Sequence, residues 1–131
     1  MLDTPECRQL LAVAARDTGF GRIGIPTDQA PLVVPVNFEL HDHHVVVRVG
    51  PGFLADSAGD RLVAFEVDHV DTAAGVAWSV LVRGLATLIG DPTGRDLAGA
   101  PHPLVPEPGQ LILTIRPDVV TGRRFEFPPA A

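Results

Sequence analysis

Apolar and polar residues alternate along most of this chain, in the two-residue period of half-buried β-strands. The clearest alternation covers residues 32–40, where every second side chain is Leu, Val or Phe. Shorter strands are expected over residues 22–25, 44–49, 62–70 and 111–116. Residues 119–127 follow Pro117-Asp118 as an extended tail.

The longest strand is expected over residues 76–89, and it is apolar on both of its faces. Such a strand must be covered on both sides. In a small chain, the second cover is often another subunit or the N-terminal helix. Arg83 interrupts one face, and a buried arginine would need a partner such as Glu66, Asp68 or an anion.

A helix is expected at the N-terminus, because Asp3 or Thr4 can cap it and Pro5 suits its first turn. Glycines at positions 19 and 21 end it. Its apolar stripe would pack on the sheet and consists of Leu10, Leu11, Ala14 and Ala15. A second, short helix is expected over residues 53–58. The Pro- and Gly-rich segment 91–109 offers at most a helical turn near residues 95–97.

A two-residue hairpin loop at Asp42-His43 would set the register of the strands on either side of it. Apolar residues then meet each other, as in the pair Phe38/Val47, and Asn37 lies opposite Arg48. Pro35 shares the face of Asn37 and cannot donate to a ladder, so this stretch is an edge or a bulge. The polar pair indicates either a ligand site or a solvated face.

Together these elements predict a mainly β fold: a six-stranded antiparallel barrel with an N-terminal helix and short connecting helices. No internal repeat or linker divides the 131 residues, so a single domain over residues 1–131 is expected.

Charge and composition exclude several functions. The chain has ten basic residues, all of them arginine, and 16 acidic residues. Its net charge of −6 gives no general attraction to nucleic acid or anionic membrane. The absence of lysine excludes a Schiff-base lysine and a P-loop lysine. Cys7 is the single cysteine and no export signal is visible, which fits a reducing cytoplasm. No apolar run approaches the roughly 20 residues that span a bilayer.

The candidate chemistry centres on the Gly50-Pro51-Gly52 turn. It leads into the short helix, and Arg48 stands two residues before it, so the region could cradle a phosphate or carboxylate. Trp78 fits either the core or an aromatic wall for a planar ligand. The histidines at 41, 43 and 44 are not expected to bind a metal, because neighbouring strand residues point to opposite faces.

Several segments resemble the pyridoxamine 5'-phosphate oxidase-like family of flavin-binding split barrels, particularly its small actinobacterial-type members. They span residues 22 to 124 in the family's order. The segments are Pro31-Leu-Val-Val-Pro-Val-Asn37-Phe38, Val47-Arg48-Val-Gly50-Pro-Gly52, Val63-Ala-Phe-Glu66-Val-Asp68, Trp78-Ser-Val-Leu-Val-Arg-Gly84 and Val120-Thr-Gly-Arg-Arg124.

The resemblance implies a split barrel that forms a homodimer, with FMN in a groove between the subunits. On that basis Arg48 and the glycine turn lie near the FMN phosphate, Asn37 edges the isoalloxazine, and Trp78 approaches from the dimer interface. The cofactor-binding residues that it implies are Pro35, Val36, Asn37, Arg48, Val49, Gly50, Pro51, Gly52, Trp78, Ser79, Arg83 and Arg124.

One departure from the family concerns the phosphate. Relatives typically carry a small hydroxyl residue and a lysine just after the glycine turn, where this chain has Phe53 and Leu54. The resemblance implies an FMN-dependent oxidoreductase that works by hydride transfer. The alternatives are an F420- or haem-binding member, or a cofactor-free binding or regulatory dimer. The pyridoxamine phosphate oxidase reaction itself is not favoured, because the chain is short and has no clear substrate-phosphate cluster beyond Arg123 and Arg124.

Overall fold

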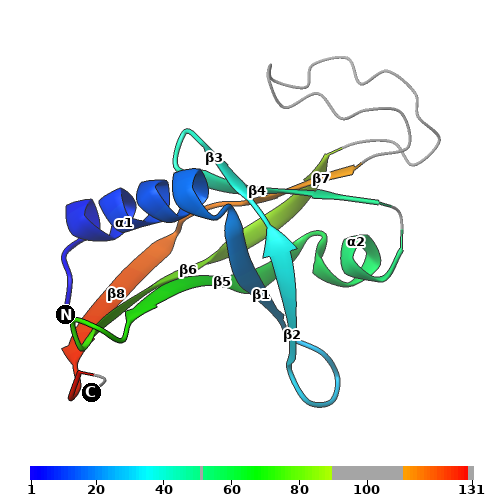
Figure 1. Cartoon of the computed structure of the whole chain (residues 1–131). Helices are drawn as coiled ribbons and strands as arrows, with labels where there is room; N and C mark the ends of the chain where they lie inside the picture. Colours follow the sequence, from blue (N-terminus) through cyan, green and yellow to red (C-terminus); the bar gives the residue numbers. More distant parts are fainter. Residues whose placement is uncertain (51, 90–110, 130–131) are drawn as a thin grey trace.

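The computed structural model describes residues 1–50, 52–89 and 111–129, and it is mainly antiparallel β-sheet (Figure 1). A long helix, α1 (Thr4–Asp17), and a short one, α2 (Phe53–Ala58), accompany eight strands. The strands are β1 (Phe20–Ile25), β2 (Leu32–Asn37), β3 (Glu39–His41), β4 (His44–Val49), β5 (Arg61–Asp71), β6 (Val76–Ile89), β7 (Leu111–Ile115) and β8 (Val119–Glu126). Pro51 and the turn expected near residues 95–97 lie outside the described residues.

Helix α1 begins and ends as the sequence predicts. A carboxylate oxygen of Asp3 accepts a hydrogen bond of 2.9 Å from the Glu6 backbone N–H, which satisfies a donor of the first turn. Gly19 follows the helix with φ of +60°, a conformation that favours glycine. The face of α1 toward the sheet buries Cys7, Leu11 and Ala14.

Strand β6 is the centre of the sheet. The described strands run in the order β2-β1-β5-β6-β7-β4-β3, and β8 pairs with β6 beside this path. The first part of β6, Val76–Arg83, pairs with β8, whereas Ala86–Ile89 pairs with β7. Gly84 lies between the two parts, where an added Cβ would collide with the backbone carbonyl oxygen of Arg116. This close approach lets the chain pass from β7 to β8 along one edge of β6.

The single strand expected over residues 32–40 is wrong, because the chain breaks at Phe38. Strand β2 pairs with β1, and only the short β3 pairs with β4. The hairpin register itself is confirmed, since Leu40 faces Val45. The expected pairing of Asn37 with Arg48 is wrong: Asn37 lies opposite Phe20. The Phe38 side chain turns into the core, and its backbone N–H donates to the carbonyl of Gly19, at 2.9 Å.

The tail expected over residues 119–127 forms a full strand, β8, along the first half of β6. With the break at Phe38, this raises the count from the expected six strands to eight in the described chain. The predicted class is confirmed: a mainly β, antiparallel split barrel with an N-terminal helix. Pro35 lies on β2, which is an edge strand, as its missing N–H requires.

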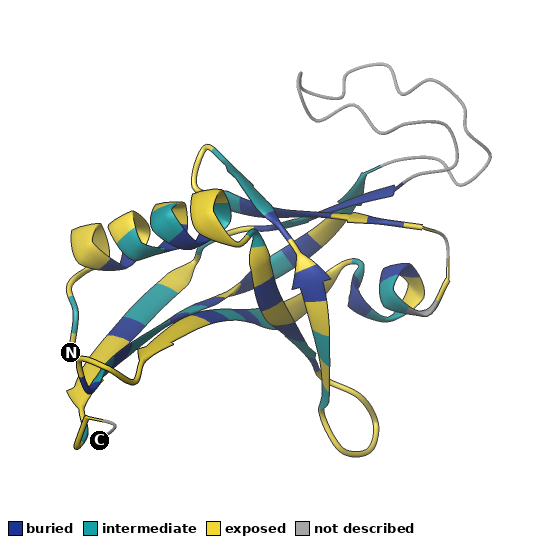
Figure 2. Cartoon of the chain, viewed as in Figure 1, coloured by how far each residue is buried: buried dark blue, intermediate teal, exposed yellow. Residues whose placement is uncertain are grey.

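The inner face of the curled sheet carries the hydrophobic core. Along β6, Val80, Val82 and Ala86 are fully buried and point inward, and α1 and α2 pack on this side. Buried residues alternate with more exposed ones along β1 and the first part of β5 (Figure 2), as expected for strands with one covered face, whereas β4 and β7 are buried at most positions. The alternate residues of β6, from Ser79 to Leu85, form an outer face.

Candidate functional site

The outer face of the sheet carries several exposed apolar side chains among its polar residues. Apart from Met1, every exposed large hydrophobic residue in the described chain occupies an outward-facing position on β1, β2, β5 or β8. These residues are Phe20, Val33, Leu62, Val70, Val119 and Phe125. Val70 and Phe125 flank Ala77 in one continuous row across three strands. Exposed apolar side chains on an open sheet face suit a surface that binds a ligand or a partner.

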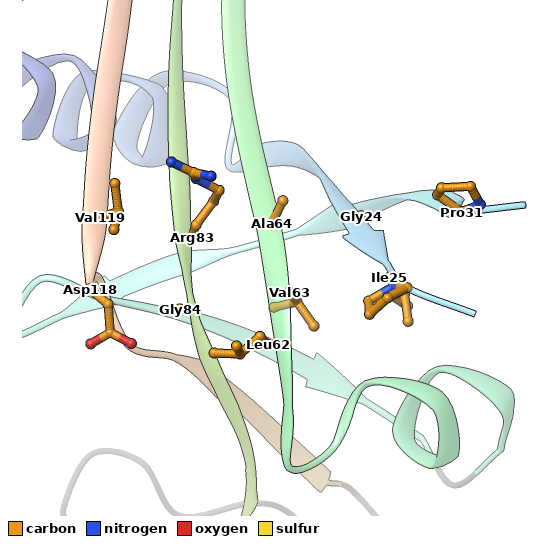
Figure 3. A pocket seen from close by; sticks show the side chains of 11 residues that line it. Gly24, Ile25, Pro31, Leu62, Val63, Ala64, Arg83, Gly84, Asp118 and Val119 are labelled. Carbon is orange, nitrogen blue, oxygen red and sulfur yellow. The ribbon is translucent and has the colours of Figure 1, made fainter. Parts of the chain in front are cut away.

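A groove of about 580 Å³ opens on this face (Figure 3). Its walls come from β1, β5, β6 and the start of β8, together with the segment that follows β1. Most of the lining is apolar, and only Arg83 and Asp118 are charged: Gly24, Ile25, Pro26, Pro31, Leu62, Val63, Ala64, Arg83, Gly84, Asp118 and Val119. Figure 3 shows the side chains of Arg83 and Asp118 extending away from each other.

The two charged groups of the groove differ in their partners. Asp118 accepts a hydrogen bond from Arg116 Nε at 2.5 Å and one from the Leu85 backbone N–H at 3.4 Å. The hydrogen bond from Arg116 lowers the pKa of Asp118. No carboxylate in the described ranges lies within ion-pair distance of Arg83. Arg83 is therefore the one charge of the groove that is available to a ligand.

The expected burial of Arg83 against Glu66 or Asp68 is wrong. Arg83 is exposed, and both carboxylates bond instead to Arg22, whose Nη1 lies 3.2 Å from an oxygen of each. The strand register explains why Glu66 bonds to Arg22, because Arg22 lies directly opposite Glu66 on the neighbouring strand. Desolvation and the adjacent Asp68 carboxylate raise the pKa of Glu66.

The residues expected around the cofactor are distributed over three places. Pro35 and Asn37 lie on the outer side of β2, and Ser79 and Arg83 lie on the outer side of β6. Of all these expected residues, only Arg83 lines the groove. Pro35, Asn37 and Ser79 lie on the same face of the sheet as Arg83, but they do not line the groove.

A second group of expected residues faces the interior. Val36 and Val49 are buried in the core. Trp78 is half-buried and packs against the core, with its ring 6.2 Å from the ring of His69. Arg124 lies opposite Trp78 on β8 and is exposed. Of the two interpretations of Trp78, core packing accounts for its position within this chain.

The third place is the end of β4. Arg48 donates through Nε to Oε1 of Glu39 at 2.7 Å, and Oε2 of Glu39 lies 3.5 Å from Nε2 of His41. The hydrogen bond from Arg48 lowers the pKa of Glu39. Gly50 and Gly52 follow, and an added Cβ at either would meet nothing within 4 Å. Arg48 therefore stands beside open space but already has a carboxylate partner.

The described residues contain no group of three or more His, Cys, Asp or Glu side chains placed to hold a metal ion. Among them, too, no helix has the length and apolarity required to cross a membrane.

Sequence reasoning missed most of the groove. Leu62 and Val119 form its walls, and both are apolar residues at outward-facing strand positions. Their alternation relative to the inward-facing Val63 and Val120 is visible in the sequence. Pro31 and Asp118 lie in connections, and only the folded chain brings them to β5 and β6.

Comparison with known proteins decides the family. The model of the pyridoxamine 5'-phosphate oxidase family matches residues 3–124, nearly the whole chain. The chain belongs to this family. The match includes every strand of the groove, from β1 to the start of β8.

Two proteins with sequences similar to this chain come from mycobacteria. An uncharacterized protein of Mycobacterium tuberculosis is 31% identical over 131 residues, which cover 95% of this chain and 84% of that protein. The structure of an FAD-binding protein from Mycobacterium smegmatis is 31% identical, covers 96% of this chain and 98% of its own, and superposes with a TM-score of 0.74. An FAD-binding protein from Mesorhizobium loti, 22% identical over 94% and 93% of the two chains, has the same fold with a TM-score of 0.70.

Proposed function

We propose that this protein binds a flavin in the groove on the outer face of the sheet and acts as a flavin-dependent oxidoreductase. The observation that carries the proposal is the groove itself: an apolar cavity with one available guanidinium, that of Arg83. The FAD-binding protein of Mycobacterium smegmatis, which is 31% identical over almost the full length of both chains, supports a flavin as its ligand.

The size and lining of the groove fit this ligand class. Its volume of about 580 Å³ falls within the roughly 300–1,000 Å³ of most small-molecule sites. Apolar walls such as Leu62 and Val119 suit an isoalloxazine ring, and Arg83 can donate to a carbonyl or phosphate oxygen. A bound flavin supplies the hydride transfer, and the protein then has to supply position and electrostatics.

A second copy of the chain would complete the site. The groove lies on the same face as the side chains of Val70 and Phe125, which are exposed in the single chain. We propose that two copies face each other here. Arg48 and the glycine turn, which lie outside the groove of their own chain, would then contact the phosphate portion of the cofactor.

The form of the flavin follows from the phosphate contacts that the chain can offer. FMN ends in a phosphate monoester, whereas the diphosphate of FAD is linked at both ends. Leu54 stands where relatives typically carry a lysine, and Arg48 is partnered by Glu39. Both features favour FAD over FMN as the resident flavin.

The decisive experiment is retention of flavin by the purified protein. We expect a two-banded visible flavin spectrum to survive desalting after incubation with excess FAD. Arg83→Ala should weaken FAD binding about tenfold or more, the loss expected for a charge-assisted hydrogen bond. Arg8→Ala, which removes an exposed arginine of α1, is the matched control and should leave binding unchanged.

Release of all added FAD, FMN and riboflavin by the parent chain would contradict the proposal. The same titration with F420 and with haem then separates the remaining cofactor classes from a cofactor-free dimer. If Arg83→Ala binds FAD as tightly as the parent does, the groove is not the flavin site.

A further inference from the structure

The β3–β4 hairpin contains a compact polar cluster outside the groove. Glu39 bridges its other two members, through Oε1 to Arg48 Nε at 2.7 Å and through Oε2 toward His41 Nε2 at 3.5 Å. Because Arg48 lowers the pKa of Glu39, the carboxylate is ionised at neutral pH. The positive charge of Arg48 is thus offset within its own hairpin.

Arg48 nevertheless remains accessible to a ligand. Its side chain is 33% exposed, and the turn containing Gly50 and Gly52 borders open space. A guanidinium has five N–H donors, and Glu39 occupies only the one on Nε. An anion can therefore approach the two terminal nitrogens, but it then lies close to the carboxylate of Glu39.

We infer that Glu39 is a specificity-determining residue that disfavours flavins ending in a phosphate monoester. The inference rests on the proposed function, with Arg48 as the contact of the ligand's phosphate. A phosphate monoester carries between one and two negative charges at neutral pH, so it is repelled by a neighbouring carboxylate. Riboflavin has no phosphate and escapes this repulsion, whereas each phosphate of the FAD diphosphate carries a single charge and is repelled less than a doubly ionised monoester.

FMN and riboflavin form a matched pair of probes, because they differ only in the phosphate. We would measure the dissociation constants of both from the quenching of flavin fluorescence, for the parent chain and for Glu39→Gln. This variant keeps the shape of the side chain and removes its charge. We expect FMN to bind about three- to tenfold more tightly to the variant, whereas riboflavin binding changes by less than about twofold.

Arg48→Ala and the double variant test whether Glu39 acts through Arg48. In the Arg48→Ala background, Glu39→Gln should no longer change the ratio of FMN to riboflavin affinity by more than about twofold. Asp17→Asn is the charge-matched control: it also removes one carboxylate beside an arginine, Arg16 at 3.5 Å, but on α1. It should leave the ratio unchanged.

Two results would overturn the inference. If the parent and Glu39→Gln bind both flavins with an unchanged ratio, Glu39 does not select the ligand. If Glu39→Gln binds FMN more weakly, Glu39 instead orients Arg48 for the phosphate. Failure of the parent chain to bind either flavin is a separate result, which overturns the proposed function and the inference with it.

Discussion

The ring of Phe38 packs edge-to-face against the ring of Phe65, with centroids 4.8 Å apart and an angle of 61° between the ring planes. Both side chains are buried. Phe38 is the residue between β2 and β3, and Phe65 lies in the middle of β5. The contact therefore anchors the point at which the chain leaves one part of the sheet for another.

Phe38→Ala should destabilise the protein by about 3–5 kcal/mol, because it removes a buried aromatic ring and leaves a cavity beside Phe65. The midpoint of urea unfolding measures this loss. Phe38→Leu fills more of the space and should cost less. A loss below about 1 kcal/mol for the alanine variant would show that the contact does not anchor the strand break.

Gly84→Ala should destabilise the protein by at least about 2 kcal/mol, because the added Cβ collides with the carbonyl oxygen of Arg116 and the backbone must shift. Gly24→Ala is the matched control within the sheet, since its Cβ would meet only ordinary contacts, the nearest at 3.6 Å. Thermal unfolding of both variants tests this, and equal melting temperatures would contradict the prediction.

The proposed dimer predicts the sedimentation behaviour of the chain. The parent should sediment with twice the monomer mass of 13.9 kDa. Leu62→Glu places a charge on the outer face and should shift the protein toward the monomer, because burying that charge is costly. Ala12→Glu, on the exposed side of α1, should remain dimeric. A monomeric parent at micromolar concentration would contradict this interface.

Glu39 and Glu66 should give opposite pH dependences of stability. The pKa of Glu39 is lowered in the folded chain, so its stabilising contribution is present above the unfolded value of 4.5 and is lost as the pH falls through the folded value. The pKa of Glu66 is raised, so its contribution is fully present below 4.5 and is lost as the pH rises through the folded value.

Replacing each glutamate by glutamine isolates these contributions. Relative to the parent, Glu39→Gln should be less stable at pH 7 and should approach the parent as the solution is acidified below about pH 4. The stability of Glu66→Gln should be closest to, or above, that of the parent at pH 7. It should fall relative to the parent as the solution is acidified. Urea unfolding at a series of pH values measures both, and parallel pH profiles for all three proteins would contradict the assignment.

Cys7 should be unreactive in the folded protein. It is fully buried where α1 meets β8, and burial raises the pKa of its thiol, so little thiolate is present at neutral pH. We expect a disulfide reagent such as DTNB to label it at least about 100-fold faster in urea than in buffer. Equal rates would show that α1 detaches readily from the sheet.

The sequence was sufficient for the class of fold because its strand signal is local. Alternation predicted β6 with its bounds, and Asp42-His43 gave the correct hairpin register. It was not sufficient to locate the break at Phe38, because the alternation continues through that residue without interruption. The break arises from tertiary contacts with Gly19 and Phe65, which lie far away in the chain.

The candidate site was less predictable for the same reason. Asn37 and Arg48 seemed paired in the sequence only because the strand was taken as continuous. Arg83 was expected to pair with Glu66, Asp68 or an anion, but the register of β1 against β5 places Arg22 opposite Glu66, and both carboxylates bond to Arg22. Family resemblance identified the kind of ligand, whereas the groove depends on Leu62, Pro31 and Val119 meeting in space.

The position of β8 on β6 has a consequence for how the protein is made. The bridge between Leu2 and Gly122 joins residues that are far apart in the sequence, and Cys7 of α1 packs against the same strand, β8. During synthesis, half of β6 therefore keeps an open edge until β8 has followed it out of the ribosome, and such edges invite pairing with other chains. Because most strand pairs are also distant in sequence, we expect folding to take milliseconds to seconds.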